Sequence, residues 1–163
     1  MSGARNFKGM STIEVGRKAP PFTLEGTDGS WSLQDAGGSN VVIYFYPRDN
    51  TPGCTQEGTS FAAAHAQFKK LKTLIRGISP DTVDSHVKFK KKMGFPFELL
   101  SDPDQAVCKL YDVIREKSMY GKKYLGVERS TFLIDASGLL RQEWRKVKVN
   151  GHTESVLAAV KAL

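Results

Sequence analysis

Apolar and polar positions along this chain follow the two periods that are typical of strands and helices. A continuous apolar run at residues 41–46, rich in β-branched and aromatic side chains, predicts a buried strand. The run ends at Pro47, and after a polar turn a helical pattern begins at residues 52–54. Proline is tolerated there, because the first turn of a helix has no acceptor for the N–H that proline lacks. The pattern therefore places Cys54 in the first turn of a helix, just beyond the carboxyl end of a central strand.

Beyond Cys54 the pattern predicts a strand–helix–strand unit. Apolar residues recur at helical spacing, and residues 74–78 predict the next strand, so the crossover between the two strands should be right-handed. The helical stripe comprises Phe61, Ala64, Phe68 and Leu71.

The second half of the chain predicts shorter elements. A helix capped within residues 79–84 should run to Met93, with Gly94 and Pro96 closing it, and Leu99-Leu100 predicts a short strand. Residues 101–104 should start a helix that carries Cys108, and residues 116–124 predict a polar, basic loop. A closing helix should have Thr153 as its N-cap and a buried stripe of Val156, Leu157, Val160 and Leu163.

Two hairpins complete the predicted elements. Residues 26–29 and 135–138 are glycine-containing turns, each flanked by segments that alternate in the manner of strands. Strands mixed with helices in this order indicate an α/β fold. We predict one domain over residues 1–163, with residues 1–12 as a loose leader.

Composition narrows the class of protein. The hydrophobic and charged fractions of 40% and 25% are ordinary for a globular chain, and no apolar run exceeds six residues, so we expect no membrane span. Residues 1–20 lack the apolar core of a secretory signal. Two cysteines do not make a secreted disulfide scaffold and fit a reducing cytoplasm.

The formal net charge of +7 raises the question of nucleic acid. The lysines and arginines are scattered, and no nucleic-acid motif accompanies them, so we predict no specific nucleic-acid binding. A positive surface could instead steer an acidic reductant towards the protein.

The position of Cys54 carries chemistry. Unpaired N–H groups and the helix dipole favour a negative charge at a helix start, so a cysteine there is favoured as the nucleophilic thiolate. Thr51, three residues earlier, can bring a hydroxyl to the same pocket. The alternative is that Cys54 is one more small buried core residue.

The frame Pro47-x-x-x-Thr51-x-x-Cys54 resembles the active-site motif of peroxiredoxins. The longer string YFYPRDNTPGCTQE, with SDPD at residues 101–104 and RSTFLID at residues 129–135, is similar to the bacterioferritin comigratory protein (peroxiredoxin Q) subfamily. The similarity runs from about Val15 to the C-terminus. It implies a thioredoxin-like sandwich, with a central mixed β-sheet flanked by helices and an N-terminal β-hairpin. It also implies reduction of hydrogen peroxide and organic hydroperoxides, without cofactor or metal.

The resemblance assigns roles to particular residues. The Thr51 hydroxyl and the N–H groups of Gly53 and Cys54 would face the peroxide oxygens, and Pro47 would wall the pocket. A fixed positive charge would hold the thiolate, and by resemblance its source is Arg129. Glu57 matches the glutamate that orients this arginine in the family. The alternatives are a surface strand-end residue for Arg129 and an ordinary first-turn acid for Glu57.

The remaining polar residues of interest receive structural predictions. Arg48, Asp49 and Asn50 lie in the variable part of the motif, where we expect turn formation. His65, His86 and His152 are isolated in the sequence and show no metal-ligand spacing, so we expect solvated or capping side chains.

The chain departs from the subfamily at the resolving cysteine. Family members place this second thiol where the chain has Thr59 or, in a second variant, Lys90. Cys108 remains, and we expect it to be a small packed residue. The resemblance then favours a one-cysteine mechanism, with thioredoxin, glutaredoxin or a small thiol as reductant. We expect a monomer, with a dimer as the alternative. A redox-responsive sensor or holdase with slow turnover is the alternative function, and a basic nucleic-acid-binding module comes third.

Overall fold

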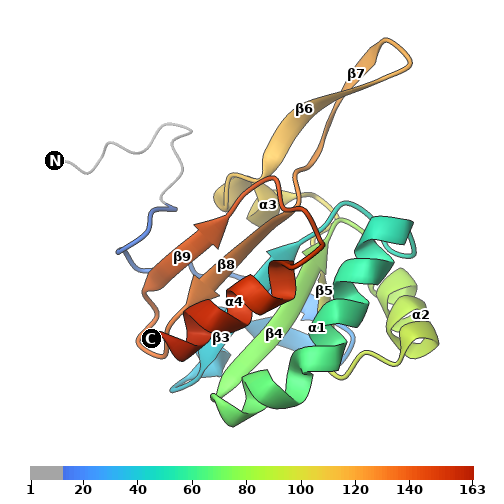
Figure 1. Cartoon of the computed structure of the whole chain (residues 1–163). Helices are drawn as coiled ribbons and strands as arrows, with labels where there is room; N and C mark the ends of the chain where they lie inside the picture. The colour runs from blue at the N-terminus through green and yellow to red at the C-terminus, as the bar shows by residue number, and fades with distance from the viewer. Residues whose placement is uncertain (1–12) are drawn as a thin grey trace, which may run out of the picture.

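The computed structural model describes residues 13–163, so the predicted leader at residues 1–12 lies outside the described residues. Seven strands form one mixed sheet in the order β2-β1-β5-β4-β3-β8-β9 (Figure 1). The sheet strands are β1 (Thr23–Gly26), β2 (Gly29–Ser32), β3 (Asn40–Phe45), β4 (Thr73–Ser79), β5 (Glu98–Ser101), β8 (Ser130–Ile134) and β9 (Leu140–Trp144).

Helices cover both faces of this sheet. Three of them, α1 (Pro52–Lys70), α2 (Val83–Met93) and α4 (His152–Lys161), pack on the face that Val42 and Tyr44 present, and they lie in front of the sheet in Figure 1. The opposite face, with Ile43 and Phe45, is covered by α3 (Ala106–Leu110) and the 3-10 helix η2 (Leu33–Ala36). Successive residues of β3 therefore point into two separate cores, which explains why its sequence is apolar throughout. The predicted mixed sheet with flanking helices and an N-terminal hairpin is confirmed.

The register of the central strands brings two distant segments together. Strand β3 is parallel to β4 and antiparallel to β8, and Phe45 at the end of β3 pairs with Ser130 at the start of β8. The residue before Ser130 is Arg129, so this register carries Arg129 to the carboxyl edge of β3. The loop to α1 leaves the sheet at the same edge.

The prediction of a polar, basic loop at residues 116–124 is wrong, because this segment forms two strands. Strands β6 (Ile114–Met119) and β7 (Lys122–Val127) form a separate two-stranded ribbon that projects from the body of the molecule (Figure 1). Tyr120 and Gly121 connect them with φ angles of 53° and 78°, the positive values that a tight hairpin turn of type I′ requires. The sequence of this ribbon shows no alternation of apolar and polar residues, because both faces of an isolated ribbon tolerate lysine and other polar side chains.

Two predicted helix starts also need correction. Helix α4 begins at His152 after Gly151, which has a φ of 78°, so Thr153 lies inside the helix and is buried. Leu163 follows the helix and is exposed, so it does not belong to the buried stripe. Helix α3 begins at Ala106, after residues 101–104, and the Asp102 carboxylate accepts hydrogen bonds from the N–H groups of Val107 and Cys108 at 3.2 and 2.8 Å.

No helix within residues 13–163 combines the length and the apolar character that a membrane crossing requires.

Candidate active site

Cys54 lies in the first turn of α1, just after the loop that connects β3 to this helix. Half-buried Pro47 follows the strand, Thr51 is the N-cap of α1 and Pro52 is its first residue, which makes Cys54 the third. The helix leaves the N–H groups of Gly53 and Cys54 without intrahelical acceptors, because no carbonyl precedes them by four residues within the helix. The Cys54 side chain is only 2% exposed. The sulfur therefore sits in an enclosed site at the positive end of a long helix.

One guanidinium connects this sulfur to a buried carboxylate. Arg129 Nη2 donates to Cys54 Sγ at 3.4 Å, and Nη1 of the same group donates to Glu57 Oε1 at 2.6 Å. Glu57 is one helical turn after Cys54, so both residues meet Arg129 on one face of α1. The Arg129 carbonyl accepts from Val147 N at 3.0 Å, which fixes the start of β8 against the loop after β9. The alternative of a free surface arginine does not fit this geometry.

Gly53 makes room for the guanidinium. A Cβ atom at this position would lie 3.0 Å from Arg129 Nη2, closer than such contacts normally are. The nitrogen concerned is the one that donates to Cys54 Sγ. Absence of a side chain at residue 53 therefore sets how closely Arg129 approaches the sulfur.

Burial controls the charge on Glu57 and Arg129. Burial raises the pKa of Glu57 to about 7, although the Arg129 guanidinium pulls it down. Burial alone would lower the pKa of Arg129, but Glu57 and Cys54 raise it above its ordinary value. The second carboxylate oxygen, Glu57 Oε2, is buried without a hydrogen-bond partner among the described residues. The ion pair is therefore strongest above pH 7, where Glu57 is ionised.

Within residues 13–163 the Thr51 hydroxyl makes its hydrogen bond to the backbone and not to the Cys54 sulfur. Its hydroxyl donates to the Arg48 carbonyl at 2.9 Å instead, and its own carbonyl accepts from Thr55 N at 2.8 Å. Thr51 thereby closes the turn between the strand and the helix. Its oxygen keeps lone pairs that can accept a hydrogen bond from a ligand.

Asp49 has a role in the site that sequence reasoning missed, because it was assigned only to turn formation. Its carboxylate is buried and accepts from Tyr46 Oη at 2.6 Å and Ser85 Oγ at 2.8 Å, and it contacts His86 Nδ1 at 2.7 Å. These bonds tie the loop before Cys54 to the start of α2. The prediction of a solvated or capping His86 is wrong, since this side chain is fully buried and its Nε2 lies 2.9 Å from the Leu100 carbonyl.

Asp49, Asp81 and His86 have ligand atoms within 4.8 Å of one another, a spacing that could suit a metal ion. Both carboxylate oxygens of Asp49, Oδ2 of Asp81 and both ring nitrogens of His86 already have protein partners. Asp81 Oδ2 accepts from Asp49 N at 2.8 Å and from Ser79 Oγ at 2.6 Å. The cluster is therefore explained as the anchor of the loop, without a bound ion.

His152 is also buried, which corrects the prediction for this residue. Its Nε2 lies 2.8 Å from Thr131 Oγ1, and its ring packs edge-on against Phe61 of α1 and Trp144 of β9. Burial, together with the nearby Arg129 charge, lowers the pKa of His152 to about 4. A neutral His152 thus lies within the electrostatic reach of Arg129. No periodic signal in the sequence indicated this contact.

The two cysteines lie on opposite faces of the sheet. Cys54 belongs to the core under α1 and α4, whereas Cys108 belongs to the core under α3, and both thiols are free. Burial, followed by the hydrogen bond to Asp102, raises the pKa of the Cys108 thiol well above its ordinary range. Cys108 is the packed residue that we predicted.

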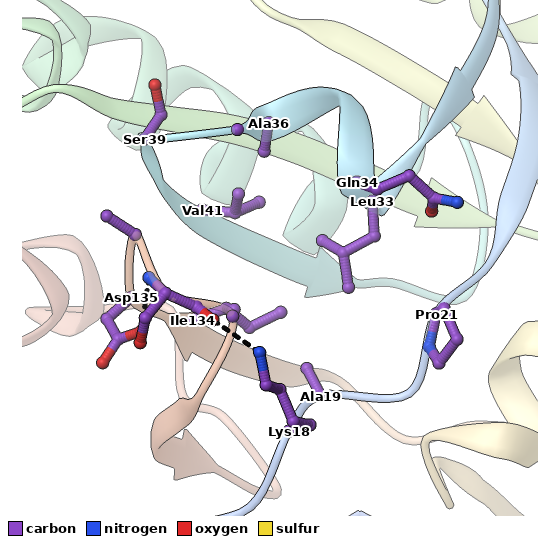
Figure 2. A pocket seen from close by; sticks show the side chains of 14 residues that line it. Lys18, Ala19, Pro21, Leu33, Gln34, Ala36, Ser39, Val41, Ile134 and Asp135 are labelled. Atoms are coloured by element: carbon purple, nitrogen blue, oxygen red, sulfur yellow. Dashed lines mark hydrogen bonds between the residues drawn. The ribbon is translucent and has the colours of Figure 1, made fainter.

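A well-formed pocket lies away from this chemistry. Its volume is about 460 Å³, and Lys18, Val41 and Ile134 are among the residues that line it (Figure 2). Val41 pairs with Ile134 at the end of β3 that is remote from Cys54. The Lys18 ammonium donates to the Ser137 carbonyl at 3.0 Å. The site at Cys54 is defined by its side-chain chemistry, and no cysteine of the described chain lines this hollow.

A thiol held by a guanidinium at a helix start, beside the carboxyl edge of a mixed sheet, defines a thiol-redox protein. Comparisons with known proteins narrow this class. Residues 15–143 match the model of the AhpC/TSA family. The chain is 49% identical over 147 residues to a putative peroxiredoxin Bcp of Coxiella burnetii, covering 90% of this chain and 97% of that protein. It is 52% identical over 142 residues to peroxiredoxin Bcp of Xanthomonas campestris, covering 87% and 88%.

A solved structure of Xanthomonas campestris peroxiredoxin Q superposes with a TM-score of 0.83 at 51% identity, covering 86% of this chain and 90% of that one. The predicted thioredoxin-like fold is confirmed. The chain belongs to the AhpC/TSA family, within its Bcp or peroxiredoxin Q group. Membership makes it a thiol-dependent peroxidase.

Proposed function

We propose that Cys54 is the thiol that reduces hydrogen peroxide and organic hydroperoxides, in a one-cysteine mechanism completed by an external thiol. One observation carries the proposal: a single guanidinium, Arg129, joins the enclosed Cys54 sulfur to buried Glu57. A positive group so placed stabilises both the thiolate and the negative charge that develops on the departing oxygen.

The first step is a displacement at oxygen. The Cys54 thiolate attacks one peroxide oxygen, the S–O bond forms as the O–O bond breaks, and the second oxygen leaves as an alkoxide or hydroxide that takes up a proton. Cysteine is oxidised to the sulfenic acid and the hydroperoxide is reduced to an alcohol or water. The N–H groups of Gly53 and Cys54 and the Arg129 guanidinium supply donors for the reacting oxygens. Thr51 Oγ1 accepts the hydrogen bond of the peroxide O–H, and Pro47 narrows the approach.

The second step needs a thiol from another molecule. Cys108 faces the other core, and the chain has Thr59 and Lys90 where relatives of the subfamily carry a resolving cysteine. Thr59 is exposed on α1, and Lys90 is paired with Glu98 at 2.9 Å. The reductant is accordingly a thioredoxin, a glutaredoxin or a small thiol. We place the protein in the cytoplasm, where free thiols such as these persist, and propose that it acts as a monomer without cofactor or metal.

Intact-mass measurement after one equivalent of peroxide tests the proposal. We expect a gain of one oxygen, located at Cys54 by fragmentation, in both the native chain and a Cys108→Ser variant. Cys54→Ser should abolish peroxide consumption in the presence of dithiothreitol. Loss of two hydrogens from the native chain would indicate an internal disulfide and refute the one-cysteine mechanism. Oxidation that stops after one equivalent, with a reductant present, would instead favour the redox sensor.

A further inference from the structure

We propose that the β6–β7 hairpin is the surface on which an acidic dithiol protein docks to reduce oxidised Cys54. This inference rests on the proposed function, since it supplies the external thiol of the second step with a binding site. The hairpin comprises residues 114–127 and pairs with no other strand of the described chain.

The first observation is the exposure of large apolar side chains. Met119, Tyr120, Tyr124 and Leu125 are 56%, 97%, 44% and 64% exposed. They make up four of the seven large apolar side chains that are exposed within residues 13–163. A two-stranded ribbon has no second layer to cover such residues, and a cluster of them is typical of an interaction surface.

The second observation is the positive charge between these apolar groups. Cross-strand pairing places Lys117 opposite Tyr124 and Met119 opposite Lys122, so apolar and basic side chains share one face of the ribbon. On the other face Lys123 is opposite Ser118 and Leu125 is opposite Glu116, so each face carries exposed apolar and basic side chains. Lys122 and Lys123 are exposed and have no acidic partner among the described residues. A partner that fits this surface carries carboxylates around an apolar patch.

The third observation is the continuity of this surface with the reactive sulfur. Strand β7 ends at Val127, two residues before Arg129. Burial lowers the pKa of Lys117, and the Arg129 charge lowers it further, whereas Cys54 raises it. The Lys117 ammonium, which donates to the Val127 carbonyl at 2.6 Å, therefore lies within electrostatic reach of both site residues. A protein bound along the hairpin is thereby brought to the segment that leads into Arg129, the residue that contacts Cys54.

The chemistry explains why a docking surface is useful here. A thiolate of the dithiol partner attacks the Cys54 sulfenic sulfur, an S–S bond forms, and hydroxide leaves and is protonated to water. The second thiolate of the partner then attacks its own sulfur in this mixed disulfide. Cys54 leaves as the thiolate, and the partner departs as an internal disulfide. Because Cys54 is 2% exposed, the first turn of α1 opens before a protein thiol reaches the sulfur.

A second copy of the chain is the less suitable occupant. It would present the same basic hairpin, so Lys122 and Lys123 of the two copies would face like charges. The net charge of +7 extends this repulsion to the whole molecule. An acidic partner gains from the same charges during encounter.

The experiment compares two reductants in steady-state peroxide reduction. They are a thioredoxin of net negative charge at pH 7 and dithiothreitol, which is small and neutral. The apolar variant carries Tyr124→Ser and Leu125→Ser, and the charge variant carries Lys122→Glu and Lys123→Glu. We expect kcat/KM for the thioredoxin to fall about tenfold in each, mainly through KM, which corresponds to about 1.4 kcal/mol of binding. Turnover with dithiothreitol and the single-turnover rate of Cys54 oxidation should not change.

A matched control removes the same kinds of side chain elsewhere. Leu163→Ser with Lys161→Glu alters an exposed apolar residue and a lysine at the C-terminal end of α4, which lies far from the hairpin in Figure 1. Its kcat/KM for thioredoxin should equal that of the native chain. Raising the salt concentration to about 0.5 M should slow thioredoxin-driven reduction of the native chain and leave the charge variant nearly unaffected.

Each other outcome has a distinct meaning. Unchanged thioredoxin kinetics in both hairpin variants, or no thioredoxin-driven reduction of the native chain while dithiothreitol supports turnover, overturns the docking proposal alone. An equal loss with both reductants also overturns it, because the hairpin would then be supporting the site. Conversion of a native dimer to a monomer in the hairpin variants, with unchanged thioredoxin kinetics, would identify a second copy as the occupant. Absence of peroxide turnover by the native chain with dithiothreitol refutes the proposed function itself.

Discussion

The Cys54 sulfur and the Arg129 guanidinium lie 3.4 Å apart although 75 positions separate them in the chain. The contact exists because β3 pairs with β8 in a register that puts Phe45 opposite Ser130. Arg129 donates from one nitrogen to Cys54 and from another to Glu57, and these two hydrogen bonds fix the orientation of the planar guanidinium. A point charge could not address both partners in this way.

Arg129→Lys should therefore slow peroxide reduction even though it keeps the positive charge. A lysine ammonium cannot donate to Glu57 and to Cys54 with the same geometry. We expect the second-order rate constant for Cys54 oxidation by hydrogen peroxide, measured in stopped flow, to fall about 100-fold. The control is Arg141→Lys, which changes an exposed arginine paired with Asp135 and should leave this rate constant unchanged. A native rate in Arg129→Lys would show that charge alone is sufficient.

Gly53→Ala should reduce the rate by displacing the same guanidinium. The added methyl group would meet Arg129 Nη2 at 3.0 Å, so this nitrogen must shift by a few tenths of an ångström from its position beside the sulfur. Alanine is compatible with the second position of a helix, so we expect little change in the free energy of unfolding. The oxidation rate should fall about tenfold, since small misplacements of a stabilising group are costly. At Gly37 an added Cβ atom would make only an ordinary contact, 3.9 Å from the Gln34 carbonyl oxygen, so Gly37→Ala should leave that rate unchanged. Equal rates in the two alanine variants would contradict this account.

Sequence patterns predicted the half of the site that is local in the chain. The apolar run before Pro47 and the proline at the helix start were sufficient to place Cys54 in the first turn of α1, where the structure has it as the third residue. Arg129 could not be chosen from patterns, because its position depends on a strand register between distant segments. Only the resemblance of the RSTFLID string singled it out. His86 and His152 were misassigned because a buried polar contact has no periodicity along the chain.

Asp49 illustrates the same limit and gives a prediction about stability. Its carboxylate joins Tyr46, Ser85 and His86, and an amide cannot accept from both Ser85 and His86 in the same way. We expect Asp49→Asn to lower the free energy of unfolding by about 2–4 kcal/mol, measured by urea denaturation. Asp84→Asn removes an acid that is 80% exposed and paired with Lys88 on the same helix, and it should change the free energy by under about 0.5 kcal/mol. Similar losses in both variants would remove the assigned anchoring role.

Because the pKa of buried His152 is lowered, we expect the protein to lose stability in acid. Burial, aided by Arg129, lowers its pKa in the native state to about 4, against an ordinary value of 6.5. Between these values the unfolded chain binds a proton that the native chain does not, so the free energy of unfolding falls as the pH drops from 6.5 towards 4. His152→Gln retains a partner for Thr131 and has no titration in this range. Its urea midpoint should depend less steeply on pH over that interval than the native midpoint does. Parallel curves for the two proteins would contradict the burial of a neutral His152.

Because the pKa of buried Glu57 is raised, we expect this residue to make the free energy of unfolding depend on pH with the opposite sign. Burial raises its native pKa to about 7, whereas the unfolded chain releases this proton near the ordinary value of 4.5. Between pH 4.5 and 7 the native state therefore holds more protons than the unfolded state, and the free energy of unfolding falls as the pH rises. Glu57→Gln removes this dependence, so the native chain should lose on the order of 3 kcal/mol relative to the variant over that interval. The measurement is urea unfolding of both proteins at several pH values, with the exposed Glu154→Gln as a control that should follow the native curve. A difference between native and Glu57→Gln that stays constant from pH 4.5 to 7 would show that Glu57 is ionised throughout, held by Arg129 despite its burial.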